Sequence, residues 1–213
     1  MAEALEVTVT AAVASFRDPL YSAIQKSLPC PPPATIGGML AAAAGGWDHV
    51  DPDTRFAAAF TAAGDGVDVE TWHPIGSNGK RFDAQPRDRD FLVDVKLSIW
   101  FTMDVEIWLH RLRRPVYGLT LGRSQDLAGV STRIVHLIES TDVPIGQTIF
   151  PTDEVGNLRL PTAVSHDRGR TRWGSYWYFP DGGDRPIGPA KTTEDGRAVV
   201  LLPYTHPQRI EEP

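Results

Sequence analysis

Cysteine is nearly absent from this chain, because Cys30 is the only one in 213 residues. No disulfide can therefore form within the chain, and its cysteine usage gives no sign of an oxidising compartment. Long hydrophobic runs are missing too: the apolar stretch 36–47 is glycine-rich and well short of the about 20 residues that span a bilayer. The N-terminus carries acids instead of the basic start of a signal peptide. We therefore expect a cytoplasmic protein with no membrane partner.

The signatures of common catalytic and metal sites are also absent. The six histidines include no close pair with the spacing of metal ligands, so we predict no metal site. Residues 122–126 (GRSQD) lack the second glycine of a nucleophile elbow. Residues 76–81 (GSNGKR) have the wrong spacing for a P-loop and no serine or threonine after the lysine. We predict a chain without a cofactor, and the preferred interpretation assigns no catalytic residue.

Basic residues are outnumbered, with 21 Lys and Arg against 27 Asp and Glu and a net charge of −6. This balance argues against nucleic-acid binding over the whole surface but leaves room for a local basic track. Three runs are locally rich in arginine or lysine: residues 80–89, 107–123 and 166–172. Arginine pairs with phosphate through its planar guanidinium, so each run is a candidate RNA contact. The alternative for each run, a solvated face of the fold, stays open.

The spacing of apolar residues predicts the regular elements. Alternation predicts a strand over 5–16 and another, the clearest, over 93–101. Apolar residues at i, i+3, i+4 and i+7 predict a helix over 105–112, which Pro115 ends. Residues 55–62 fit a helix by their alanines and a strand by their aromatics. Further elements are expected: a helix over 35–44 capped by Thr35, a strand over 116–121 that runs into the turn 122–124, and strand-like pieces over 133–138, 147–150, 173–179 and 198–202.

If residues 55–62 form a strand, the element order is β-α-β-β-α-β. This is the ferredoxin-like (RRM-type) unit of the α+β class. The polar, turn-rich stretch at about 65–92 is then a β-hairpin inserted between the second and third strands. We predict a ferredoxin-like domain over 1–140 that includes this insertion, and a β-rich C-terminal extension over 141–213 that packs on the same domain.

A proline-rich spacer sets the start of the helix over 35–44. Prolines at 29 and 31–33 hold φ near about −65° and remove amide donors. The amides of Ile36, Gly37 and Gly38 then lie at a helix N-terminus, which favours anions such as phosphate. A tight structural turn explains the same residues equally well, and both interpretations stay open.

Three segments together resemble the CRISPR-associated Cas-five family, the RAMP subunits of the type I Cascade complex. They are residues 14–19 (ASFRDP), residues 27–45 and residues 115–127 (PVYGLTLGRSQDL). The insertion 76–92, with its Gly-Lys-Arg and its Arg-x-Arg-Asp-Phe-Leu-Val run, is similar to the thumb of that family. The likeness extends from about Glu3 to Glu139 and is greatest for type I-B members.

The resemblance implies a ferredoxin-like RAMP fold and a non-catalytic ribonucleoprotein subunit for antiviral defence. Such a subunit binds CRISPR RNA (crRNA), holds its 5′ handle and places its thumb across the guide. The implied partners are the Cascade backbone subunit and large subunit, with target DNA reached indirectly through the complex. The strand end and helix start would meet the handle through Phe16, Arg17, Lys26, Gly37 and Gly38. The turn and the thumb would add further RNA contacts: Arg123, Ser124, Gln125, Lys80, Arg81, Arg87 and Arg89.

The thumb departs from the family pattern, because Asp83, Asp88 and Asp90 interleave with its four cations and reduce the expected phosphate contacts. A second function also stays open. One branch of the family is a metal-independent endoribonuclease that processes precursor crRNA with Tyr, Lys and His side chains. Such acid–base cleavage needs groups within hydrogen-bond reach of the 2′-hydroxyl and the leaving oxygen. The candidates here are Tyr21, Lys26, His73 and Lys80.

Overall fold

An antiparallel sheet of seven strands forms the centre of the computed structural model, which describes residues 2–21, 25–73, 75, 79 and 83–211. The order along the sheet is β10-β9-β5-β1-β4-β2, and β3 joins it through β4. Its strands are β1 (Ala2–Ala14), β2 (Ala57–Thr61), β3 (Gly64–Trp72), β4 (Gln85–Phe101), β5 (Gly129–Ser140), β9 (Ala190–Thr192) and β10 (Ala198–Val199). With its few helices, the chain has a mixed α+β fold built mostly of strands.

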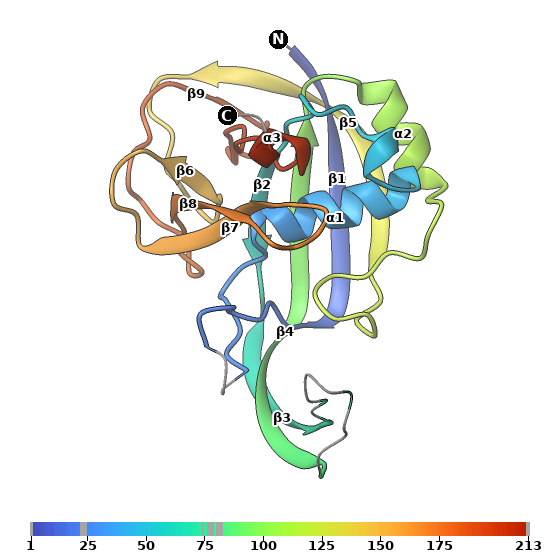
Figure 1. Cartoon of the computed structure of the whole chain (residues 1–213). Coiled ribbons are helices and arrows are strands. Elements are labelled where there is room, and N and C mark those ends of the chain that lie inside the picture. Colours follow the sequence, from blue (N-terminus) through green and yellow to red (C-terminus); the bar gives the residue numbers. More distant parts are fainter. Residues whose placement is uncertain (1, 22–24, 74, 76–78, 80–82, 212–213) are drawn as a thin grey trace.

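Two helices cover one face of this sheet, α1 (Pro33–Ala44) and α2 (Val105–Arg113), as Figure 1 shows. Beneath them lie alternate residues of the two central strands, including Val7 and Val9 of β1 and Leu97 and Ile99 of β4, all fully buried. Burial of every second residue explains the alternation in the sequence. The predicted strands over 5–16 and 93–101 and the predicted helix over 105–112 are confirmed.

Helix α1 begins two residues earlier than predicted, and Thr35 does not cap it. The N-cap is Pro32, with no side-chain hydrogen bond, and Pro33 is the first helical residue. Proline suits this position because its φ is already helical and it has no amide to satisfy. The helix ends at Gly45, which adopts the left-handed conformation with φ of 93°.

The opposite face of the sheet is partly covered by the C-terminal part of the chain. Glu6 is buried there, and its carboxylate accepts hydrogen bonds from Trp100 Nε1 at 3.0 Å, Arg133 Nη2 at 3.0 Å and Arg197 Nη2 at 2.9 Å. Arg197 also donates to Ser98 Oγ at 3.0 Å. A buried carboxylate needs such partners. This cluster therefore ties the segment before β10 to β1 and β4.

A second sheet follows β5, with the order β6-β8-β7. Its strands are β6 (Phe150–Thr152), β7 (Leu158–Val164) and β8 (Thr171–Trp177). Tyr176 and Tyr178 from this region belong to the same buried cluster as β1 and α1. The domain boundary near residue 140 stays a prediction. The short helices are η1 (Trp47–His49) and α3 (Gln208–Glu211), and none of the helices in the described ranges is long and apolar enough to cross a membrane.

Two expectations about the elements are resolved by the structure. Residues 57–61 form the strand β2, so the strand interpretation of 55–62 was right. Residues 116–121 do not form a strand, and the turn after them precedes the strand β5 instead of following one. The segment folds back on itself, because Leu121 N donates to Asp126 O at 3.0 Å and Ala128 N donates to Leu119 O at 2.9 Å.

A two-stranded hairpin, made of β3 and the first half of β4, projects from one end of the body (Figure 1). It begins at Gly64 opposite Val93 and its pairing runs to Trp72 opposite Gln85. These bounds agree with the predicted hairpin over about 65–92, while its place as an insertion in a ferredoxin-like unit stays a prediction. We call it the hairpin, and it positions the candidate site.

Candidate nucleic-acid interface

The register of the hairpin divides its side chains between two faces, because neighbours along a strand point to opposite sides. Glu70 lies opposite Arg87, and Trp72 lies opposite Gln85, so these side chains share one face with Arg89. We call this side the arginine face. The Arg87 guanidinium lies over the Trp72 ring at 4.7 Å from its centroid, and its Nη2 donates to Gln85 Oε1 at 3.3 Å. An aromatic ring beside a guanidinium is a combination suited to stacking a base next to a phosphate.

A chain of ion pairs joins the arginine face to the turn before β5. Arg89 Nε lies 2.6 Å from Glu70 Oε2, Arg123 Nη1 lies 3.0 Å from Glu70 Oε1, and Arg123 Nε lies 2.9 Å from Asp126 Oδ2. The hydrogen bonds to Asp126 and then to Glu70 raise the pKa of Arg123, so it stays charged. The side chains of Arg89 and Arg123 are only 14% and 13% exposed. Arg123 therefore fixes the hairpin against the body, while Arg89 links the two strands of the hairpin through Glu70.

The same turn packs directly on the end of β1. Gly122 has φ of 99°, and a Cβ on it would lie 2.6 Å from Ser15 O, so only glycine fits this close approach. Ser15 Oγ in turn donates to Asp90 O of β4 at 2.7 Å. The segments 14–19 and 115–127, which are far apart in sequence, thus meet at the foot of the hairpin.

The loop after β1 returns along its own start. Leu28 N donates to Phe16 O at 2.7 Å, and Asp18 N donates to Lys26 O at 2.9 Å. Arg17 is exposed at this point. Lys26 Nζ lies 3.0 Å from Asp90 Oδ2, on the opposite face of the hairpin from Arg87 and Arg89. The structure therefore does not place Lys26 on the face that carries Arg87 and Arg89.

Two residues expected to meet RNA are buried inside the protein. Phe16 is 3% exposed and packs edge-on against Phe60, with ring centroids 5.7 Å apart. Gly37 is buried against Thr205, where a Cβ would lie 2.5 Å from the Thr205 Oγ1 atom. Neither offers a surface to a ligand. Phe16 is part of the apolar core, and Gly37 allows α1 to pack closely against Thr205.

The helix-terminus interpretation is also corrected at one amide. Ile36 N donates to Pro32 O at 3.1 Å and is not free for an anion. Gly38 is half-buried, and the space where its Cβ would point is open. Close packing therefore accounts for Gly37 but not for Gly38.

The remaining expected residues lie near the surface or outside the described residues. Ser124 and Gln125 are exposed on the turn beside Arg123. Lys80 and Arg81 lie outside the described residues. Tyr21 and His73 are exposed on different segments, the loop after β1 and the end of β3. In the part of the chain that the structure describes, no cluster of His, Cys, Asp and Glu fits a metal ion.

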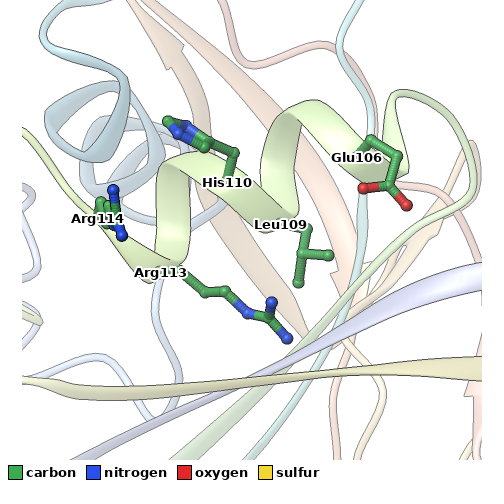
Figure 2. A pocket seen from close by; sticks show the side chains of 5 residues that line it. All are labelled: Glu106, Leu109, His110, Arg113 and Arg114. Carbon is green, nitrogen blue, oxygen red and sulfur yellow. The ribbon is translucent and has the colours of Figure 1, made fainter.

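The arginines of α2 form a separate surface, away from the hairpin. Figure 2 shows Arg113 and Leu109 on one side of the helix and His110 and Arg114 on another, around a recess of about 360 Å³. Arg111 instead donates to His49 O at 2.6 Å. The recess is lined by no Phe, Tyr or Trp ring, and Glu106 at its far end opposes the approach of a phosphate. Both features favour the interpretation of this run as a solvated helix face.

The family model described as CRISPR-associated protein (Cas_Cas5) matches residues 4–182, most of the chain. The chain belongs to this family. None of the curated proteins matches the sequence of this Cas5-family member. Its role is therefore CRISPR-associated, while the type I-B subtype stays a prediction.

Solved structures resemble this Cas5-family chain over nearly its whole length. A chain of a CRISPR RNA-guided surveillance complex has a TM-score of 0.58 at 18% identity, and the match covers 97% of this chain and 96% of that chain. A Cas protein has a TM-score of 0.47 at 13% identity, covering 94% and 95%, and a CRISPR protein from Archaeoglobus fulgidus has 0.46 at 14%, covering 94% and 99%. The first likeness supports the α+β fold described above.

Sequence reasoning missed two carboxylates that define the interface of this Cas5-family chain. Glu70 and Asp126 bind Arg123, while Trp72 lies under Arg87 on the same face of the hairpin as Glu70. The available signal was the alternation of β3, which places Glu70 and Trp72 on one side of the strand. That signal was weak, because the register of a hairpin is needed to see which arginines lie opposite.

Proposed function

We propose that this Cas5-family chain is a non-catalytic, crRNA-binding subunit of a type I Cascade complex, of the I-B subtype, in the cytoplasm. In this role it holds the 5′ handle of the crRNA, and the hairpin acts as a thumb that lies across the guide. Its partners are the crRNA, the backbone subunit and the large subunit of the complex. Target DNA is reached indirectly through the assembly.

One observation carries this proposal: the segments that resemble the family converge at the foot of the hairpin. Gly122 packs on Ser15, and Arg123 holds Glu70 of β3 at 3.0 Å. The turn at 122–126, which contacts both the end of β1 and Glu70 of β3, thereby sets the direction in which the hairpin projects. A strand that must lie across a bound guide needs such a fixed direction, because a freely swinging hairpin would lose entropy on binding.

The RNA contacts divide into groups that touch the ligand and groups that position them. Arg87 over Trp72 offers charge and stacking on the arginine face, and the exposed Ser124 and Gln125 lie on the adjoining turn. Arg17 is exposed at the end of β1. Arg89 and Arg123 are occupied by Glu70 and Asp126, so we assign them as positioning residues. Lys80 and Arg81 are kept as proposed thumb contacts.

The body is inferred to be a ferredoxin-like unit. Its support is the strand order β5-β1-β4-β2 with antiparallel neighbours, and the chain order β1, α1, β2, β4, α2, β5. This is the β-α-β-β-α-β arrangement with the hairpin inserted between its second and third strands. Arg197 over Trp100 covers part of the sheet face that RRM-type proteins use for RNA. This covering favours the hairpin foot as the RNA site.

The test is to purify the assembled complex and sequence its RNA, for the natural chain and two double variants. Arg17→Ala with Arg87→Ala should lower the crRNA retained by about tenfold, because two charge-assisted contacts are lost. Arg113→Ala with Arg114→Ala removes the same charge from α2 and should leave crRNA retention unchanged. Absence of crRNA from the natural complex would end the proposal.

The endoribonuclease alternative is tested by incubating the isolated protein with a CRISPR repeat hairpin in EDTA. The non-catalytic role predicts intact RNA. Cleavage would overturn it, and the variants Tyr21→Phe, His73→Ala and Lys80→Ala would then identify the groups responsible.

A further inference from the structure

The face of the hairpin opposite the arginines has a different chemistry. Val67 lies opposite Asp90, Val69 lies opposite Asp88, and Asp65 lies on the same side one step nearer the body. Val67 and Val69 are each 63% exposed, and Asp88 is exposed opposite Val69. We call these five residues the acidic face. The aspartates that interleave with Arg87 and Arg89 in sequence are thus separated from them in space.

A recess lies at the foot of the acidic face, with a volume of about 500 Å³. Asp65, Val67 and Asp90 form one wall. Leu92 of β4 and loops of the body form the others, and the loop residues include Leu28, Pro29, Tyr178, Pro180 and Asp181. The recess therefore combines apolar side chains with the carboxylates of Asp65, Asp90 and Asp181.

The charge of this surface is strongly biased. Asp65, Asp90 and Asp181 line the recess against the single cation Lys26, whose Nζ already lies 3.0 Å from Asp90. Among the residues that the structure describes, no ion pair engages Asp65, Asp88 or Asp181. RNA would be repelled here, whereas a cationic side chain would gain attraction from several carboxylates at once.

The free edge of β3 is a less suitable contact. In the described part of the chain β3 pairs with β4 alone, but Val69 N already donates to Asp68 Oδ1 at 2.8 Å. A charged side chain that satisfies an edge amide opposes the addition of another strand. A partner therefore meets the face and its recess, and not the edge.

We propose that the acidic face and its recess bind a basic segment of a protein partner in the assembled complex, with a lysine or arginine side chain in the recess and aliphatic groups on Val67 and Val69. This rests on the assembly part of the proposed function. The hairpin then separates two ligands, RNA on the arginine face and protein on the acidic face.

Site-specific photo-crosslinking in the assembled complex tests this. Benzoylphenylalanine replaces Val69 in one variant and Trp72, on the arginine face, in a matched variant. The Val69 position should crosslink to a peptide rich in lysine or arginine from another subunit, and the Trp72 position to crRNA. An RNA adduct at Val69, or an intact complex with no protein adduct there, would overturn the inference.

Charge reversal supplies an independent readout. Asp65→Lys with Asp88→Lys should reduce the crosslinked subunit that co-purifies by at least about tenfold at 0.15 M salt, because the attraction becomes repulsion. Asp153→Lys with Glu154→Lys, an exposed acidic pair elsewhere, should leave it unchanged, and circular dichroism checks that both variants fold. Unchanged co-purification of the hairpin variant would contradict the inference. Loss of crRNA from the natural complex would instead contradict the proposed function.

Discussion

The two halves of β4 lie in opposite environments. Residues 97–101 are all buried between the helices and the C-terminal segment, whereas residues 85–90 are exposed or half-buried in the hairpin. Asp94, at the junction, has a positive φ of 47°. One continuous strand therefore serves as the core of the body and as half of a projecting two-stranded hairpin.

This contrast shows how the hairpin keeps its direction without a core of its own. An isolated two-stranded hairpin is marginally stable in water. The body half of β4 is held by buried apolar side chains and by the Glu6 cluster. The hairpin half is held at its foot by Arg123 and Glu70, and by Lys26 and Asp90. Its outer faces are thereby left available for ligands.

The largest effect is expected in the body half. Leu97→Ala removes a fully buried side chain and leaves a cavity, so the free energy of unfolding should fall by about 3 kcal/mol. Asp88→Ala in the hairpin half should change it by less than about 0.5 kcal/mol. Urea unfolding followed by circular dichroism measures both. Equal losses would mean that the two halves are not energetically distinct.

A slightly smaller loss is expected from Glu6→Gln. The change leaves Arg197 and Trp100 Nε1 without their carboxylate partner, which should lower the free energy of unfolding by about 2–3 kcal/mol. This loss is smaller than that expected for a fully buried ion pair, because the side chains of Arg133 and Arg197 are partly exposed. Glu106→Gln, on the exposed side of α2, is the control. A loss no larger than that of the control would show that the cluster contributes nothing to the body.

Arg123→Ala tests whether the ion pairs at the foot of the hairpin hold it against the body. It removes the partner of buried Asp126 and of Glu70, with an expected loss of about 1–2 kcal/mol in local stability and of about 1–3 kcal/mol in crRNA binding. Hydrogen exchange should accelerate over 64–72 and stay unchanged over 97–101. Arg123→Lys should restore only part of the effect, because a lysine does not bridge two carboxylates as a guanidinium does. Uniform acceleration across both ranges would indicate general destabilisation instead.

The elements with strong apolar periodicity could be predicted from the sequence. Alternation over 93–101 and the helical spacing over 105–112 depend on burial of one face, and both elements formed. Residues 116–121 also alternate, but Leu119 and Leu121 are buried in a loop that pairs with itself through Asp126 and Ala128. The local sequence pattern does not distinguish such a loop from a strand, because the difference lies in whether the segment hydrogen-bonds to another strand or to itself.

The candidate site was only partly predictable. The resemblance selected Arg123, but its role depends on Glu70, which is 53 residues away in sequence and adjacent only after the hairpin folds. The resemblance also selected Phe16 as a contact to the handle, but its burial beside Phe60 follows from tertiary packing. The positive and negative side chains of residues 87–90 lie on opposite faces of the hairpin, because neighbours along a strand alternate in direction. This separation could have been predicted from the sequence once the segment was taken as a strand.

The smallest effect sharpens the distinction between contact and positioning on the arginine face. Arg87→Ala should leave stability nearly unchanged and weaken binding of a crRNA repeat oligonucleotide by about 1 kcal/mol, or roughly fivefold. If Arg87 meets a phosphate, the slope of log K against log salt should fall by about 0.7, the value for one contact on a single strand. Arg113→Ala carries the same charge change on α2 and should alter neither quantity. A reduced slope with Arg113→Ala and an unchanged slope with Arg87→Ala would move the RNA from the hairpin to α2.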